Sequence, residues 1–366
     1  MKKIAIFTII GRGPGTKLQN YALQFYLENN FNCKVKTIRR KSYYYEKISI
    51  KSLTWKEILK FIINYKGFRE FLLNERKVQE KWLDFDKNIH YTKELIKKND
   101  GPIDKKFNRE YDYFIVGSDQ VWNPNWYPDI NYFKYISKSK CIAYAASFGV
   151  YSVPKKLNKV FSVALEHMNY ISVRETAGAN IVKTLINREV PVVIDPTLLL
   201  SKNEWLGIAK RPNWYNGQKY ILAFFLGDIT SEKKKIIDVL ALNKESKVIY
   251  PMKDFNDDWA KVGPAEFLYL IANSELVLTD SFHGTVFSII MNRPFWVFDR
   301  IQNGLNNMNS RLDTLLNLFN FENRHINISN DIDYEDIYNI DFSNVNNILD
   351  KEKKVVMEFF MKIFKN

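Results

Sequence analysis

Residues 276–285 read LVLTDSFHGT and decide the fold class of this chain. The apolar start predicts a buried strand, the polar residues after it predict helix caps, and Val286, Ile289 and Ile290 recur at the spacing of one helix face. His283 is therefore expected at a helix N-terminus, directly after the carboxyl end of a parallel strand. Open α/β sheets bind ligands at this edge, where free backbone N–H groups and the helix dipole attract anions.

Alternating strand and helix patterns extend from this passage in both directions and predict two Rossmann-like, doubly wound α/β domains. The N-terminal domain is expected over residues 1–200 and the C-terminal domain over 219–330. A linker rich in Pro, Asn and Gly is expected at 201–218. A helical segment, 331–366, follows, and its last helix is a candidate to cross back to the N-terminal domain. Two such domains facing each other across a cleft form the architecture called GT-B.

Hydrophobic periodicity also places the individual elements. The predicted strands are 3–10, 33–38, 113–116, 141–145, 170–173, 190–194, 219–226, 247–250, 275–278 and 295–298. The predicted helices are one that starts at a capping box of Thr16 and Gln19, then 155–168, 175–186, 232–242, 264–273, 284–291 and about 347–364. A helical hairpin is predicted from a capping box of Thr54 and Glu57 to about Trp82.

Composition excludes several classes of protein. A chain of 366 residues with 46% hydrophobic content can bury the cores of two domains. No apolar run approaches the roughly 20 residues that span a bilayer, and residues 4–10 are interpreted as a first strand rather than a signal peptide. Cys33 and Cys141 are too few for a disulfide framework or a zinc site and fit a reducing cytoplasm. The aspartates at 254, 257 and 258 are interpreted as loop residues, so no metal is expected.

The formal charge of +13 comes mostly from one segment. Residues 33–81 carry 14 basic and 5 acidic side chains, hence a net charge of +9. Such a segment suits an anionic partner, either a membrane surface, a phosphate-bearing substrate or nucleic acid, or else it is a solvated helix face. Its helical part, about 50–82, is expected as an insertion that packs on the sheet or lies on anionic lipid. No recognition helix or stacking sheet accompanies the charge, so no nucleic-acid partner is expected.

Several separated blocks resemble the polysaccharide pyruvyl transferase family, in the order of that family and over roughly residues 1–325. They are LQ at 18–19 with YAL at 21–23, VGSDQVWN at 116–123, SFG at 147–149, SVRE at 172–175, DPT at 195–197, VGPAEF at 262–267, TDSFHGT at 279–285, NRPF at 292–295 and NSR at 309–311. The resemblance implies a GT-B-like bacterial enzyme without a cofactor. Its donor would be phosphoenolpyruvate, and its product a pyruvate ketal on a sugar of a surface polysaccharide or its lipid-linked precursor.

The resemblance also implies donor-binding residues. The family's donor contacts are a His that matches His283 and Arg residues that include one at Arg174. Some members carry an Arg at the position of Ser281, so Arg293, Arg300 and Arg311 are candidates to supply the missing charge. Guanidinium groups suit the donor's phosphate and carboxylate because they bind both in bidentate fashion. The expected donor set is Arg174, Ser281, Phe282, His283, Gly284, Arg300 and Arg311.

The expected catalytic residues are one acid and one of two bases. His283 would protonate the enol carbon of the donor, and Asp119 or Asp280 would help to remove the proton of the sugar hydroxyl. Both aspartates suit helix caps equally well. The glycine loop at 11–15 replaces an Asn-aromatic-Gly pattern of the family, so it is either an acceptor contact or a tight turn. The expected acceptor set is Gly13, Gly15, Gln19, Asp119, Gln120 and Trp122.

Two other functions fit the same sequence. A GT-B glycosyltransferase that uses a nucleotide sugar shares the architecture and the anion-binding turns. A non-catalytic basic protein that binds membrane or nucleic acid would account for the charge. The enzyme is expected in the cytoplasm, either free or held at the inner face of the cell membrane through residues 33–81.

Overall fold

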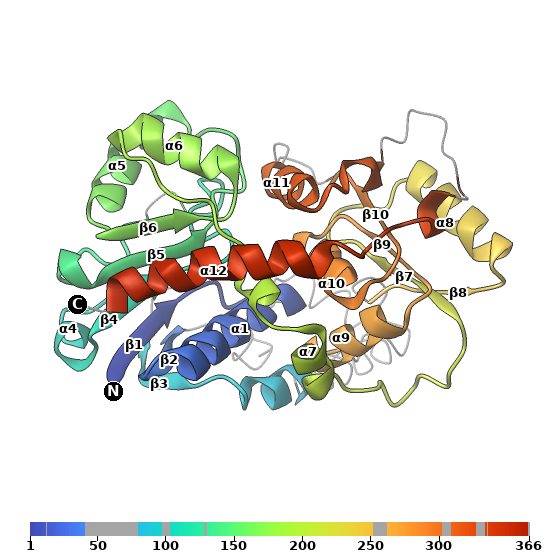
Figure 1. Ribbon diagram of the computed structural model, residues 1–366, viewed down its shortest axis with the longest axis horizontal. Helices are drawn as coiled ribbons and strands as arrows, with labels where there is room; N and C mark the ends of the chain where they lie inside the picture. The colour runs from blue at the N-terminus through green and yellow to red at the C-terminus, as the bar shows by residue number, and fades with distance from the viewer. Residues whose placement is uncertain are drawn as a thin grey trace, which may run out of the picture.

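Two parallel sheets lie side by side in the computed structural model (Figure 1). The structure describes residues 1–11, 13–40, 80–96, 103–127, 130–251, 262–301, 309–326, 334 and 336–364. The capping box of Thr54 and Glu57, the hairpin up to residue 79 and the aspartates at 254, 257 and 258 lie outside these residues. Most of the basic segment 33–81, with its expected membrane contact, lies outside them too.

The N-terminal sheet has the order β3-β2-β1-β4-β5-β6, and all of its pairings are parallel. Along the central strand, Ile4 and Ile6 face one core while Ala5 and Phe7 face another, so helices cover both faces. The strands are β1 (Lys2–Phe7), β2 (Cys33–Arg40), β3 (Tyr91–Ile96), β4 (Tyr113–Val116), β5 (Cys141–Ala146) and β6 (Tyr170–Val173). The helices are α1 (Pro14–Asn30), α4 (Phe107–Glu110), α5 (Asn158–Glu166) and α6 (Thr176–Ile186).

The C-terminal sheet has the order β11-β10-β9-β7-β8 and is parallel as well. Its strands are β7 (Tyr220–Phe224), β8 (Lys247–Ile249), β9 (Leu276–Thr279), β10 (Phe295–Phe298) and β11 (His325–Ile326). Its helices are α8 (Ser231–Asn243), α9 (Pro264–Asn273), α10 (Phe282–Met291) and α11 (Ser310–Phe319). The two sheets confirm the predicted fold class of two doubly wound α/β domains.

Each sheet reverses its strand order at one place, between β1 and β4 in the first sheet and between β7 and β9 in the second. The loops that leave the carboxyl ends of the strands diverge at such a reversal and leave a crevice in which ligands bind. The two reversals face each other, because Gly15 in the first turn of α1 lies against His283 in the first turn of α10. The fold therefore brings two ligand-binding edges together at the domain boundary.

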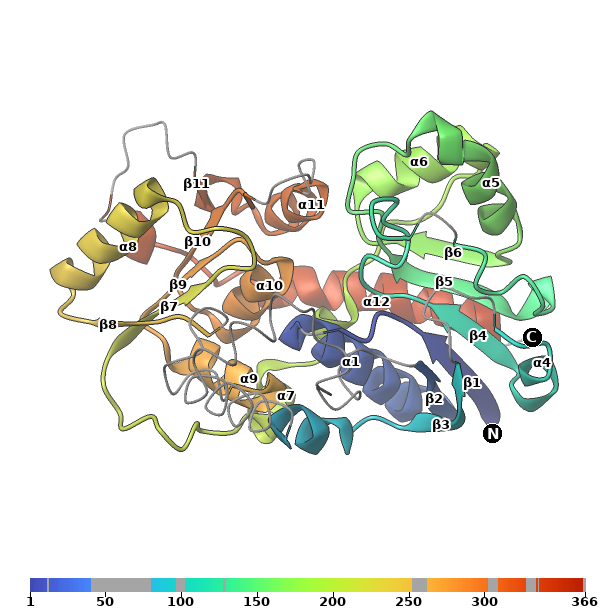
Figure 2. The same ribbon diagram turned by 180° about the vertical axis from the view of Figure 1, so that it is seen from behind.

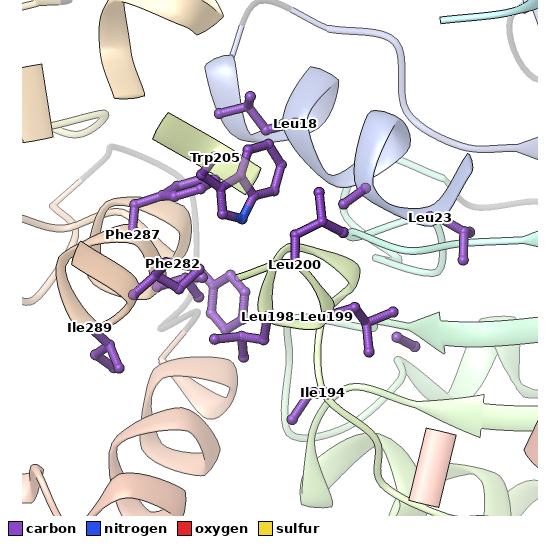
Figure 3. Close-up of a cluster of buried hydrophobic side chains, with 14 of the residues drawn as sticks. Leu18, Leu23, Ile194, Leu198, Leu199, Leu200, Trp205, Phe282, Phe287 and Ile289 are labelled. Carbon is purple, nitrogen blue, oxygen red and sulfur yellow. The ribbon is translucent and has the colours of Figure 1, made fainter. Parts of the chain in front are cut away.

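The two domains share one hydrophobic core (Figure 3). Trp205, on α7 (Lys202–Ile208), is fully buried, with its ring 5.1 Å from that of Phe287 on α10 and with Leu18 of α1 beside it. Its Nε1 donates to the carbonyl oxygen of Thr197 at 3.0 Å. Full burial of large apolar side chains contributes roughly 1.5–3 kcal/mol each. The expected linker at 201–218 thus contains a helix that is packed into the interdomain core.

Helix α12 (Val345–Phe364) runs along both domains, as Figures 1 and 2 show from opposite sides. On the N-terminal domain, the ring of Phe360 lies 4.9 Å from that of Tyr144, and the hydroxyl of Tyr113 donates to the carbonyl oxygen of Ile363 at 3.1 Å.

None of the helices that the structure describes combines the length and the apolar character needed to cross a membrane.

Three predicted local features are wrong. Helix α1 starts at Pro14, so Thr16 lies inside it and its hydroxyl donates to the carbonyl oxygen of Gly13 instead of forming a capping box with Gln19. The stretch 190–194 is no strand, since its only ladder contact is an isolated bridge from Val192. Helix α10 starts two residues earlier than predicted, because the hydroxyl of its N-cap accepts from the backbone N–H of Gly284.

Candidate functional site

The site begins where two helix N-termini meet. A Cβ atom added to Gly15 would lie 2.1 Å from Nδ1 of His283, so the first turn of α1 touches the imidazole directly. His283 is 8% exposed. The N-terminus of α1 carries no side-chain cap, and the first N–H groups of any helix lack partners within the helix. Two positive helix ends therefore point into one small volume between the domains.

Two guanidinium groups from different domains flank Asp119, and Nε of a third, that of Arg300, lies 3.8 Å from Asp280 Oδ1. Nη2 of Arg174, at the end of β6, lies 3.4 Å from Asp119 Oδ1, and Nη1 of Arg311, in the first turn of α11, lies 4.0 Å from the same oxygen. The two guanidinium groups lie over the ring of Phe282, at 4.2 Å and 5.5 Å from its centroid. Arg300 follows β10, and its charge is stabilised by Asp119 as well.

Asp195 is a functional candidate that the sequence analysis did not select. Its Oδ2 accepts from Nη1 of Arg174 at 2.6 Å and from the hydroxyl of Ser118 at 2.8 Å. Its Oδ1 accepts from the backbone N–H of Thr197 at 3.0 Å and lies 3.8 Å from Nε2 of His283. Burial by itself raises the pKa of Asp195, but His283 and Arg174 outweigh burial and hold that pKa well below its usual range. The sequence feature that points to Asp195 is the DPT block at 195–197, one of the blocks that resemble the family.

The positive charges of the three arginines are not equally compensated by neighbouring carboxylates. Burial lowers the pKa of Arg174, but Asp195 and Asp119 outweigh burial, so that this pKa is raised. Burial and the neighbouring charge of Arg174 together lower the pKa of Arg311 to about 9, against the attraction of Asp119. Burial also lowers the pKa of Arg300. Arg300 and Arg311 therefore hold positive charge that the protein compensates only in part.

Four buried nitrogen atoms at this site have no hydrogen-bond partner among the residues that the structure describes. They are Nε of Arg174, Nε of Arg300, Nε of Arg311 and Nε2 of His283. A buried donor left without an acceptor costs roughly 1–3 kcal/mol, so native structures rarely gather several of them without a reason. Such a cluster indicates a ligand rich in acceptor oxygens.

Asp280 has a structural role, contrary to its selection as a candidate base. Its Oδ1 accepts from the backbone N–H of Leu226 at 2.7 Å, and its Oδ2 accepts from that of Gly227 at 2.8 Å. Nη2 of Arg300 donates to the carbonyl oxygen of Asp280 at 3.1 Å. The carboxylate therefore joins the loop after β7 to the loop after β9, and its hydrogen bonds leave little capacity to accept a proton.

Two of the expected acceptor residues lie in the protein interior. Trp122 is fully buried, with its ring 5.2 Å from that of Phe148. Gln19 is also fully buried, and its Nε2 donates to the hydroxyl of Thr8 at 2.8 Å. Both side chains are completely buried, so neither is exposed to bind a sugar in this structure.

The other expected residues lie around the site. With its amide oxygen turned toward α11, Gln120 accepts from Nη2 of Arg311 at 3.1 Å. Gly13 is the N-cap of α1, and Ser281 is the N-cap of α10. Gly284 packs so closely on β9 that a Cβ atom would lie 2.5 Å from the hydroxyl oxygen of Thr279. These residues shape the turns that carry the functional groups.

Arg293 lies outside the site. It precedes β10 and acts on the pKa of Tyr220, the first residue of β7, so it is at the amino end of the sheet. Arg300 and Arg311, which lie at the carboxyl end, are the two candidates that the structure leaves for the charge absent at Ser281. Among the described residues, no three His, Cys, Asp or Glu side chains are grouped in a way that could hold a metal ion.

Comparison with known proteins gives a family and a set of similar structures. A model of the family described as polysaccharide pyruvyl transferase matches residues 17–302. No curated protein matches the chain significantly. The chain is similar to a solved structure of the UDP-GlcNAc 2-epimerase from Neisseria meningitidis, with 13% identity, 99% of this chain and 100% of that chain covered, and a TM-score of 0.48.

Two further solved structures extend this set. The UDP-GlcNAc 2-epimerase from Methanocaldococcus jannaschii is 12% identical over 96% of this chain and 100% of that chain, with a TM-score of 0.46. The E. coli heptosyltransferase WaaC is 8% identical over 86% of this chain and 99% of that chain, with a TM-score of 0.33. The family match confirms the resemblance found in the sequence.

Proposed function

The chain belongs to the polysaccharide pyruvyl transferase family, and we propose that it transfers the enolpyruvyl group of phosphoenolpyruvate to a sugar. The acceptor is a sugar of a surface polysaccharide or of its lipid-linked precursor. The products are a pyruvate ketal and inorganic phosphate, and the reaction uses no cofactor. The observation that carries the proposal is the cluster of three unpartnered buried nitrogen atoms, the Nε atoms of Arg174, Arg300 and Arg311, which lies with His283 at the meeting point of the two domains.

The proposed donor matches this cluster in charge and in hydrogen-bonding capacity. Phosphoenolpyruvate carries a phosphate and a carboxylate on one carbon, so it offers several acceptor oxygens to closely spaced donors. The partly compensated charges of Arg300 and Arg311 are the best sites for these anions, and the planar guanidinium fork binds each in bidentate fashion. The helix ends at Gly15 and His283 add N–H donors beside them.

The proposed reaction starts with a proton transfer from His283 to the methylene carbon of the donor. The neighbouring carbon becomes an oxocarbenium-like centre, and a sugar hydroxyl attacks it to form a new C–O bond. The bond between this carbon and the phosphate oxygen then breaks, and a second hydroxyl of the same sugar closes the ketal. Of the two hydroxyl protons released, one passes through the base to the departing phosphate and the other restores His283.

Asp119 is the proposed base for the attacking hydroxyl. It is 6% exposed and lies between the guanidinium groups of Arg174 and Arg311, so it faces the volume assigned to the donor. Asp280, the other carboxylate considered from the sequence, is bound to backbone N–H groups through both oxygens.

Both cysteines are buried and free, in keeping with the proposed cytoplasmic location.

Phosphate release from phosphoenolpyruvate, measured over a panel of sugars and lipid-linked sugars, tests the proposal. We expect His283→Ala to lower the rate by about 100-fold or more, the usual contribution of a positioned acid. His90→Ala serves as the matched control, because His90 lies on the surface and pairs with Glu28, 3.5 Å away. A thermal shift caused by a nucleotide sugar but not by phosphoenolpyruvate would contradict the proposal and favour a glycosyltransferase.

A further inference from the structure

The two nitrogen atoms of His283 face different parts of the molecule. Nε2 is buried, lacks a hydrogen-bond partner among the described residues and lies 3.8 Å from Oδ1 of Asp195. Nδ1 faces the first turn of α1 at Gly15. One edge of the ring is therefore turned toward a carboxylate, and the other toward the volume between the two helix N-termini.

We infer that Asp195 is the positioning residue of His283: it accepts the Nε2 proton across the domain boundary and leaves Nδ1 as the nitrogen that meets the donor. This inference rests on the proposed function for the identity of the donor, but not for the pairing itself. A carboxylate that binds one ring nitrogen fixes the tautomer and the orientation of an imidazole. The reactive atom would then be Nδ1 rather than the buried Nε2.

Asp195 is well suited to this role because it is held rigidly. Its side chain is completely buried, and Thr197, Ser118 and Arg174 all donate hydrogen bonds to its carboxylate. The separation of 3.8 Å exceeds a hydrogen bond of about 2.9 Å by roughly 1 Å. Catalytic hydrogen bonds are often long in the absence of substrate and tighten when it binds.

A second contact couples the same two segments. The ring of Phe282, the neighbour of His283, stacks on the guanidinium of Arg174 at 4.2 Å, and this guanidinium binds Asp195 at 2.6 Å. The first turn of α10 is thus attached to Asp195 both through the imidazole and through the Phe282–Arg174 stack. Closing the gap to Nε2 needs a small shift of one turn rather than a rearrangement of domains.

Gly15 is the residue that packs against the Nδ1 edge of the imidazole. Its φ lies outside the left-handed region, so the backbone conformation does not require glycine, and glycine in a helix costs about 0.5–1 kcal/mol relative to alanine. A Cβ atom at this position would lie 2.1 Å from Nδ1. Glycine is therefore required by the close approach of the first turn of α1 to the imidazole.

Nitrogen-15 spectra of the histidine rings test the pairing without any activity measurement. We expect the neutral ring of His283 to carry its proton on Nε2 in the wild-type protein, and to lose this preference in Asp195→Asn. His283→Ala assigns the resonances, and His90→Ala should leave those of His283 unchanged. A ring protonated on Nδ1, or a tautomer that Asp195→Asn does not alter, overturns the inference.

Kinetics supply the second arm of the test. We expect Asp195→Asn to lower the kcat of phosphate release by about 100-fold and to change its pH profile, while the thermal shift by phosphoenolpyruvate persists. Gly15→Ala should displace the imidazole and lose activity, whereas Gly11→Ala, whose Cβ meets only an ordinary contact at 3.6 Å, should behave as wild type. Equal activity of the two alanine variants overturns the inference. A wild-type protein that releases no phosphate overturns the proposed function instead, and the spectra still decide the pairing.

Discussion

Replacing Arg311 by methionine should stabilise the empty protein and abolish donor binding. Burial lowers the pKa of Arg311 from 12.5 to about 9, which corresponds to roughly 5 kcal/mol at about 1.36 kcal/mol per pKa unit. That figure is an upper limit for the cost of keeping the guanidinium charged without a ligand. The variant loses two hydrogen bonds to Gln120, at 3.1 Å and 3.3 Å, worth about 1 kcal/mol each. Methionine has a flexible, unbranched side chain that adapts to the space, so a net gain of about 1–2 kcal/mol is expected.

Denaturant and thermal unfolding with and without phosphoenolpyruvate measure both effects. The donor should raise the melting temperature of the wild-type protein, since a ligand at 100 times its Kd adds about 2.7 kcal/mol to stability. Arg311→Met should show no such shift. Arg324→Met is the matched control: Arg324 is as little exposed as Arg311, and it donates to the carbonyl oxygens of Asp336 at 2.9 Å and Asn339 at 2.8 Å.

The control variant should lose stability and keep the donor-induced shift, because both terminal nitrogen atoms of its guanidinium donate to backbone carbonyl oxygens of the protein. If Arg311→Met instead lost about 2 kcal/mol or more without ligand, the argument from partly compensated charge would be wrong. If it kept the full thermal shift with phosphoenolpyruvate, Arg311 would not bind the donor. The two outcomes separate the electrostatic reasoning from the assignment of the site.

Three other variants test the packing and the pH dependence. Trp122→Phe should cost about 1–2 kcal/mol through lost contact with Phe148 and leave the acceptor KM unchanged; a tenfold rise in KM would return Trp122 to the acceptor site. Trp205→Ala should cost about 3–5 kcal/mol in denaturant unfolding because it empties the interdomain core, and a loss below about 1 kcal/mol would refute that core's importance. The hydrogen bond to Asp299 raises the pKa of His325 above 6.5. The ion pair of His325 and Asp299 therefore stabilises the folded protein fully at lower pH, and this contribution is lost as pH rises through the raised pKa. The melting temperature should therefore fall between about pH 6 and 8 in the wild-type protein but not in Asp299→Asn.

The local sequence pattern predicted helices and strands correctly where a segment's own structural preference is stronger than the influence of its tertiary contacts. The strands 113–116, 170–173 and 295–298 and the helix 264–273 agree with the prediction to the residue, because each is a short apolar run or begins with a strong start signal such as Pro264. The stretch 190–194 is equally apolar but forms no strand. Its contact with β6 is limited to two backbone hydrogen bonds around Val173, at 3.1 Å and 2.8 Å, and an apolar run alone does not predict whether such a contact extends into a ladder.

The sequence alone determined the fold class, the family and the position of His283 at a strand-to-helix turn, since these depend on periodicity and on residue order along the chain. Only the tertiary structure decided that Asp195 lies beside His283, that Arg300 and Arg311 are at the site while Arg293 is not, and that Asp280, Gln19 and Trp122 serve the interior. Those outcomes depend on how two sheets face each other across a shared core. The distance between residues in different domains is set by that packing, and no local pattern encodes it.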